Sequence, residues 1–299
     1  MTSAFTAVDL SRLPFPAVVE PLDVEAIVAA MLADLCVRDP AFTALVESDP
    51  AYKILEACAY RELLLRQRVN EAAKAVLLAY AAGSDLDQIA ANFNVQRLVL
   101  TPANPNTLPP TPAVLEPDDD LRRRVQLAFE GLSTAGPEGA YVFHALGAHP
   151  DVLDASATSP TPGVVAVSVL SRVGSGAPAA PVLAAVAAAL ADEDVRPLTD
   201  HVNVVAATIV NFTVVASLTL YPGPDSTVVL AEANARLTDY LARSRRLGRD
   251  VTRSGVFAAL HAEGVQNVAL AEPAADVVVT AAQAAFCTAR TVNVTGTGE

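Results

Sequence analysis

The sequence predicts an α+β protein, in which an N-terminal helical region with one long bundle helix is followed by two small, similar α/β modules. Three observations support this fold class. A helical pattern runs from Ala51 to Ala82 without Gly or Pro. A proline-rich stretch, Thr101–Pro117, separates this pattern from the rest of the chain. After Gly136, short Val-rich segments alternate with Ala-rich segments of helical length.

These features divide the chain into five parts. We expect an extended N-terminal arm over residues 1–23, which hold three prolines. A helical bundle region should cover residues 24–100, and a proline-rich linker with a helix should cover residues 101–136. The first α/β module is expected over residues 137–207 and the second over residues 208–299.

The helical region begins at Val24, and Asp39 and Pro40 interrupt it. Asp49 can cap the next helix, with Pro50 at its first position. This helix is expected to run to Ala82 and to stop at Gly83, which gives a rod of about 45 Å.

The long helix carries a coiled-coil-like seam. Cys58, Leu65, Ala72 and Ala79 recur every seven residues, and Val69 and Val76 lie between them. Four further leucines widen the apolar surface beyond one stripe. Such a helix packs in a bundle, either within this chain or shared between chains, and the pattern leaves both possibilities open. The candidate protein–protein interface consists of Cys58, Leu65, Arg68, Val69, Ala72 and Val76.

Shorter elements complete the region before Gly136. Asp85-Leu-Asp87 is expected to cap a short helix that ends near Phe93, and Val95–Leu100 has the pattern of a strand. Thr101–Pro117 is expected to be an extended linker. Asp118–Asp120 should begin a helix that reaches Gly131, because acidic residues suit the positive end of a helix dipole.

The remaining chain repeats similar parts in a shifted order. The first module is expected to contain helices and strands at Ala140–Ala148, Val152–Thr158, Val164–Ser171, Pro181–Ala191 and Val202–Ala206. The second module is expected to contain them at Ile209–Tyr221, Val228–Arg243, Ser254–Glu263, Val265–Leu270 and Phe286–Val294. Alternating burial in the strands indicates that helices cover one face of each sheet.

Composition argues against several classes of function. The formal net charge is −13, whereas nucleic-acid binding needs clustered basic residues. No segment approaches the roughly 20 apolar residues of a membrane span, and the N-terminus lacks a signal-peptide pattern. The three cysteines, Cys36, Cys58 and Cys287, lack metal-ligand spacing and are expected to be free thiols.

No catalytic or cofactor motif stands out. The four histidines (His144, His149, His201 and His261) are not spaced as ligands on one helix face. Gly174-Ser-Gly176 lacks the Lys of a phosphate loop, and no serine lies in a Gly-x-Ser-x-Gly elbow. Arg243-Ser-Arg-Arg246 is a local basic cluster that could pair with an acidic neighbour. We therefore expect no enzyme activity, no metal, no cofactor and no small-molecule substrate.

Several runs in order along the chain resemble baseplate J-like proteins of P2-type contractile phages. The runs include Arg66-Gln-Arg-Val-Asn-Glu-Ala-Ala73, Val167-Ser-Val-Leu-Ser-Arg172, Glu193-Asp-Val-Arg-Pro197, Arg246-Leu-Gly-Arg-Asp250 and Ala259-Leu-His-Ala-Glu-Gly-Val-Gln266. The likeness spans nearly the whole chain. The same family includes wedge proteins of tailocins and other contractile injection systems, so the particular machine stays open.

The resemblance implies a structural subunit of the baseplate wedge in a contractile tail, coupled to sheath contraction. It implies assembly in the host bacterial cytoplasm and a final place in the virion baseplate. The long helix would join a bundle with other wedge proteins, and the two modules would link wedges around the central hub. The expected partners are wedge and hub proteins and a second copy of the chain, but neither nucleic acid nor membrane.

Two other interpretations fit parts of the pattern. A cytosolic oligomeric scaffold would share the helical seam and would need no tail partners. An α/β enzyme with a helical cap would need polar groups that converge on a pocket.

Overall fold

The computed structural model describes residues 8–10, 13–42, 46–133, 136–223 and 225–298. The chain divides into two compact units. One, the N-terminal unit, comprises Ala7–Arg97 with Pro117–Val125, and the other, the α/β unit, comprises Leu98–Glu116 with Gln126–Glu299. Each unit is described by itself below.

The N-terminal unit is helical, as the sequence predicts. Its elements are α1 (Val24–Arg38), the short 3-10 helix η2 (Pro40–Phe42), α2 (Pro50–Ala75), α3 (Gly83–Ala91) and most of α4 (Asp118–Leu127). The Asp49 side chain accepts a hydrogen bond from the Ala51 amide, and Pro50 is in the first turn. This confirms the expected start of the long helix.

The long helix ends seven residues earlier than expected, at Ala75 rather than at Ala82. After Val76 the backbone enters a series of turns in which Tyr80 and Ala81 donate to the Leu77 carbonyl. Arg122 of α4 donates to two carbonyls in these turns, those of Leu78 and Ala81, each at 2.8 Å. The contact with α4 thus satisfies the backbone groups freed by the turn.

Gly83 begins α3 instead of ending α2. Its φ of 53° lies in the left-handed region, which glycine adopts without strain. Its amide donates to Asp118 Oδ2 at 3.1 Å. The expected cap at Asp85 is wrong, because α3 starts two residues earlier and its N-cap residue, Ala82, has no side chain that could cap it.

Residues 98–116 form a small hairpin in the α/β unit rather than a single extended stretch. Strand β1 (Val99–Thr101) pairs antiparallel with β2 (Val114–Leu115), and a bridge joins Asn104 to Thr111. A strand was expected over Val95–Leu100, but the observed strand β1 overlaps only the last two residues of that range. Paired backbone groups tie the proline-rich segment back on itself.

The central module is a three-stranded sheet with helices packed on it. Its elements are η3 (Glu130–Leu132), α5 (Glu138–Ala148), β3 (Val152–Thr161), β4 (Val164–Ser171), α6 (Ala180–Ala191) and β5 (His201–Ala206). Strand β4 lies in the middle, antiparallel to β3 and parallel to β5. Alternate residues of these strands, such as Val167 and Val169, are fully buried against α5 and α6.

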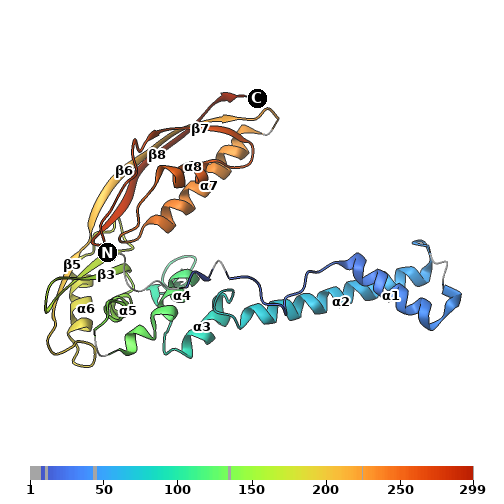
Figure 1. Ribbon diagram of the computed structural model, residues 1–299, viewed down its shortest axis with the longest axis horizontal. Coiled ribbons are helices and arrows are strands. Elements are labelled where there is room, and N and C mark those ends of the chain that lie inside the picture. The colour runs from blue at the N-terminus through green and yellow to red at the C-terminus, as the bar shows by residue number, and fades with distance from the viewer. Residues whose placement is uncertain (1–7, 11–12, 43–45, 134–135, 224, 299) are drawn as a thin grey trace. The chain divides into compact units, whose positions relative to one another are not determined.

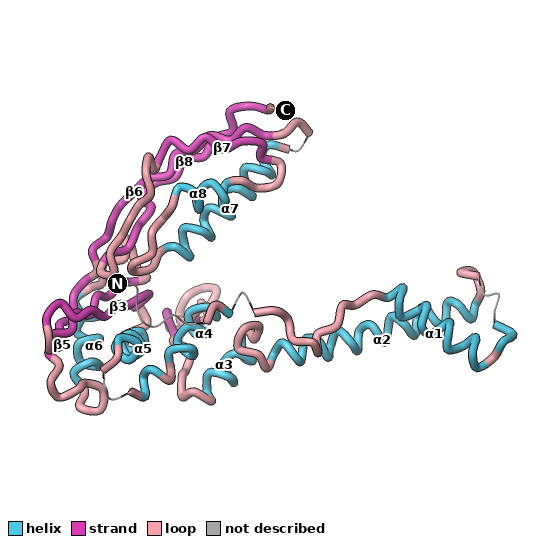
Figure 2. Tube along the Cα trace, viewed as in Figure 1, coloured by secondary structure: helices cyan, strands magenta, loops and turns pink. Residues whose placement is uncertain are grey.

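The C-terminal module is built in the same way. Its elements are β6 (Thr208–Leu220), α7 (Ser226–Ser244), α8 (Arg253–Leu260), β7 (Val265–Glu272) and β8 (Gln283–Thr297). Strand β6 lies in the middle, antiparallel to β7 and parallel to β8. Helices α7 and α8 both lie on one face of this sheet (Figures 1 and 2).

The strand orders explain the shifted repeat in the sequence. In the central module, α5 precedes the antiparallel strand β3, and α6 follows the middle strand β4. In the C-terminal module, the middle strand β6 and its helix α7 come first, and α8 and the antiparallel strand β7 come second. Both modules end in the strand that pairs parallel to the middle one. The two modules thus share one architecture, but their two helix–strand pairs come in opposite order along the chain.

A joint of hydrogen bonds and apolar side chains connects the two modules. The Leu247 amide donates to the buried Asp154 carboxylate at 2.9 Å, and Arg246 donates to the Leu153 carbonyl at 2.7 Å. Arg245 donates to the Gly174 carbonyl at 2.7 Å. Leu170, Ala207 and Ala284 form a small apolar core between them. Only Ala207 separates β5 from β6, so the two sheets are held together closely.

Candidate protein interface

One face of α2 carries apolar side chains that nothing in the described chain covers. We call it the α2 stripe: Ile54, Cys58, Leu65, Val69, Ala72 and Val76. These residues are spaced three, four or seven apart and so lie on one side of the helix. Leu65 is 68% exposed, Val69 57% and Val76 73%. Apolar side chains this exposed in one row mark a surface that can bury a partner.

The opposite face of α2 is covered from within the chain. Ala59 is fully buried against Ile27 and Val28 of α1, with Tyr52 and Leu63 packed around them. Helix α1 packs beside α2, and the segment that precedes α1 runs along α2 (Figure 1). Because internal packing already occupies one face, the stripe on the other face has no role in the core of this unit.

The N-terminal segment is held on α2 by polar and aromatic contacts. The buried Asn70 amide exchanges two hydrogen bonds with the Glu20 backbone, at 3.1 and 2.8 Å. Phe15 stacks on Tyr80 with ring centroids 4.9 Å apart, and Lys74 lies over the Phe15 ring. Sequence reasoning missed these contacts. The available signal was the single Asn of this helix, whose only other amide side chain is Gln67.

The structure brings the six residues of the predicted interface to the surface. Cys58, Leu65, Arg68, Val69 and Ala72 are exposed on α2, and Val76 is exposed at its C-cap. Arg68 lies beside Glu71 at 3.8 Å, on the rim of the stripe. Ala79, which the seven-residue spacing adds to the seam, lies in the turns after α2 and is half-buried. The helical seam therefore ends at Val76.

A shallow hollow widens the stripe toward α1. It is lined by Met31 of α1 and by Lys53, Ile54, Ala57, Cys58, Arg61, Glu62 and Leu65 of α2. The charged groups nearby form exposed pairs within α2, such as Lys53 with Glu56 at 2.8 Å. Exposed ion pairs of this kind contribute little to the stability of the fold. An apolar centre surrounded by charged residues is the arrangement found in protein–protein interfaces.

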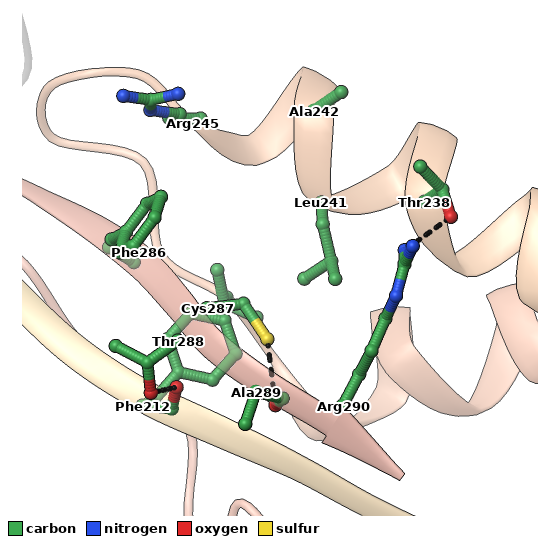
Figure 3. A pocket seen from close by; sticks show the side chains of 12 residues that line it. Phe212, Thr238, Leu241, Ala242, Arg245, Phe286, Cys287, Thr288, Ala289 and Arg290 are labelled. Carbon is green, nitrogen blue, oxygen red and sulfur yellow. Dashed lines mark hydrogen bonds between the residues drawn. The ribbon is translucent and has the colours of Figure 1, made fainter. Parts of the chain in front are cut away.

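A second hollow lies in the C-terminal module between α7 and the edge strand β8, with a volume of about 280 Å³. Phe212, Leu241, Phe286 and Cys287 form its apolar wall, and Arg245 and Arg290 lie at its ends (Figure 3). Arg290 donates to Thr238, and the Cys287 thiol contacts the Ala289 carbonyl at 3.2 Å. Burial raises the pKa of Cys287 and lowers that of Arg245.

The basic cluster Arg243-Ser-Arg-Arg246 is used mostly inside the chain. Arg243 pairs with Asp239 on the same helix, and Arg245 and Arg246 bind carbonyls at the joint between the modules. These three side chains therefore already have internal partners, and an acidic neighbour is not needed to explain them.

The other candidate features are metal-binding clusters, membrane-spanning helices and histidines. Within the described ranges, no group of three or more His, Cys, Asp or Glu side chains is placed to hold a metal ion. No described helix is both long and apolar enough to cross a membrane. His144 Nε2 lies 3.2 Å from the Gly131 carbonyl, and His149 Nδ1 accepts from the Asp151 amide at 3.1 Å. Both contacts are local and structural.

Comparison with known protein families settles the relationship of the chain. Residues 47–104 match the baseplate J-like N-terminal domain, residues 133–206 the central domain, and residues 210–295 the C-terminal domain of the baseplate J-like protein. These matches cover most of the chain. The chain belongs to the baseplate J-like family.

Baseplate protein J of Escherichia phage P2 is 51% identical to this baseplate J-like chain over 299 residues. The similarity covers 98% of this chain and 99% of the phage P2 protein. The family predicted from the sequence is thereby confirmed. Membership makes the chain a structural protein of the phage tail baseplate. The first matched region covers α2, α3 and β1, and the other two fall on the two α/β modules.

Proposed function

We propose that this protein is a wedge subunit of a contractile phage-type baseplate that links neighbouring wedges around the central hub and couples the baseplate to sheath contraction. The α2 stripe joins a helical bundle with other wedge subunits, and a second copy of the chain is one of its partners. The two α/β modules supply the contacts between wedges. Their role is structural rather than catalytic.

The observation that carries this proposal is the α2 stripe in a chain of the baseplate J-like family. Burying an apolar side chain of the size of Leu or Val stabilises an association by about 1.5–3 kcal/mol. A row of such side chains on a helix of 26 residues is enough for a stable helix–helix interface. The stripe does not distinguish a tail partner from a second copy, so the experiment must include both.

The test measures the mass of complexes by size-exclusion chromatography with light scattering. The full chain is run alone and after co-expression with the other tail proteins of the same operon. We expect a dimer alone, or a larger complex of defined stoichiometry with tail partners. Leu65→Glu and Val69→Glu should weaken that association by about tenfold or more, because each places a charge in the buried interface.

Tyr60→Glu is the matched control. Tyr60 is 55% exposed on the same helix and lies about 140° round the axis from Leu65, away from the stripe. This variant should associate like the natural chain. A monomer that ignores every tail protein would contradict the wedge function. Unchanged association of both stripe variants would contradict the assignment of the stripe, even if a complex forms.

A further inference from the structure

The edge of the C-terminal sheet offers unpaired backbone groups beside an apolar hollow. In the described part of the chain, β8 pairs with β6 on one side and with no strand on the other. Leu247 bridges only its first residues, at Ala284. Beyond Ala285 the outer N–H and C=O groups of β8 therefore have no strand to pair with, which is the requirement for addition of a strand from another chain.

Helix α7 lies over this edge. Its residues Thr238 and Leu241 face the hollow, and Phe212 and Phe286 of the sheet form the opposite side (Figure 3). A bulge at Thr288 shifts the register between β8 and β6 by one residue, since Phe212 pairs with Cys287 and Thr213 with Ala289. An edge strand, a helix above it and an apolar hollow between them form a groove.

The size of the hollow suits a side chain. Its volume of about 280 Å³ lies at the lower end of the usual range for small-molecule sites, roughly 300–1,000 Å³. The volume suits one or two aliphatic or aromatic side chains. Peptide segments that add to a sheet edge gain affinity from backbone hydrogen bonds and specificity from such pockets.

Charge identifies the rest of the occupant. Arg245 and Arg290 stand at the ends of the hollow, and none of its lining residues is acidic. Arg245 Nε is buried without a hydrogen-bond partner, although the same guanidinium donates to carbonyls at the joint between the modules. A buried guanidinium donor is stabilised by a carboxylate acceptor. The chain as a whole has a net charge of −13, so two arginines without acidic neighbours in the lining form a locally positive site that attracts an anion.

We propose that β8 and α7 form a strand-addition groove for an extended acidic segment of another tail subunit, with an apolar side chain in the hollow and a carboxylate beside Arg245 or Arg290. The proposal rests on the function proposed above, because it takes the occupant from the same baseplate. It adds a second interface, distinct from the α2 stripe, and specifies the chemistry of the partner.

Hydrogen–deuterium exchange on the full chain, alone and in the purified co-expressed complex, tests this groove. Amides in residues 289–295 should exchange in the complex at about one tenth of the rate in the free chain, or more slowly. The reason is that strand addition gives their outer N–H groups acceptors. Thr238→Trp, at an exposed position of α7 that faces the hollow, fills it, and Arg290→Glu reverses the charge at one end. Each should remove the protection of β8 and weaken the complex by about tenfold.

Ala188→Trp is the control, because Ala188 is an exposed alanine of α6 outside the hollow. It should leave both protection and assembly unchanged. A complex in which β8 exchanges as fast as in the free chain would overturn the groove while upholding the proposed function. A complex that forms normally with Thr238→Trp and Arg290→Glu would do the same. Failure to enter any complex would overturn both.

Discussion

The three cysteines lie in different surroundings and report on different parts of the chain. Cys58 is exposed in the α2 stripe, whereas Cys36 and Cys287 are half-buried. The Cys36 thiol contacts the Phe42 carbonyl at 3.5 Å. At Cys287, burial raises the pKa, so a smaller fraction of this thiol is the reactive thiolate near neutral pH. Single residues thus provide probes for both proposed interfaces.

Alkylation of the native chain should distinguish these thiols. With a maleimide near pH 7.5, we expect Cys58 to react about tenfold faster or more than Cys287, because Cys58 is exposed and the Cys287 thiolate is disfavoured. In the complex with tail partners Cys58 should become protected. Mass spectrometry of the labelled peptides measures both rates. Equal reactivity of Cys58 in the free and assembled chain would argue against burial of the stripe.

At the scale of elements, polar contacts from the distant start of α4 hold the start of α3. Asp118, at the start of α4, accepts from the Gly83 amide and pairs with Arg97 at 2.7 Å. The Arg97 side chain is only 10% exposed and also pairs with Asp87 at 2.6 Å. Partial burial raises the pKa of Asp118, but the Gly83 amide and Arg97 outweigh it and hold the pKa below the usual value. This cluster ties α3 to α4.

The depressed pKa gives the N-terminal unit a defined pH dependence. A carboxylate whose pKa is lower in the folded state stabilises that state above its unfolded pKa, about 4, and the contribution is lost as the pH falls through the folded value. Asp118→Asn should therefore lower the urea midpoint of this unit at pH 6, and the difference from the natural chain should shrink as the pH falls below about 4. Far-ultraviolet circular dichroism follows the transition of the α-helices. Asp119→Asn, whose side chain is 88% exposed, serves as the control and should change little. A deficit that stays constant with pH would contradict this linkage.

At the scale of the molecule, the two α/β modules lie in one compact unit rather than on a flexible tether. The buried Asp154 carboxylate and the Arg245-Arg-Leu247 segment connect them, and Leu170 is fully buried in the apolar core of the joint. We expect the modules to unfold together, because exposing either side of the joint leaves buried polar groups of the other side without partners.

Native-state hydrogen exchange under mild denaturant should detect this coupling. Leu170→Ala creates a cavity in the joint and should lower the opening free energy of both β4 and β6 by the same amount, about 2–4 kcal/mol. Leu198→Ala, at a fully exposed position of the central module, should lower neither. A loss confined to β4 would show that the modules open independently.

Local rules in the sequence were sufficient for most elements of the α/β modules. Strand β4 has the predicted bounds, Val164–Ser171, and α6 begins one residue early, at Ala180. The alternation of Val167 and Val169 marks the face of β4 that packs on the helices, and the Asp49-Pro50 pair marks the start of α2. These signals act over one or two turns of chain, so they need no knowledge of distant contacts.

The end of α2 and the docking of the N-terminal segment, both missed by sequence reasoning, depend on contacts between distant residues. Arg122 and the end of α2 are separated by more than forty residues, and so are Asn70 and Glu20, at a sequence distance of 50. The groove between β8 and α7 follows from β8 being an edge strand, which the strand order decides and the strand pattern does not.

The sequence by itself determined the family, the fold class and the apolar seam of the long helix, because these follow from residue spacing and from order along the chain. Only the tertiary structure decided which side of that helix is free. Ala59 and Leu65 are both apolar helix residues, yet α1 covers the first and nothing in the described chain covers the second. Periodicity records that a side chain is apolar, but burial depends on which segment packs against it, and that choice is made by the whole chain.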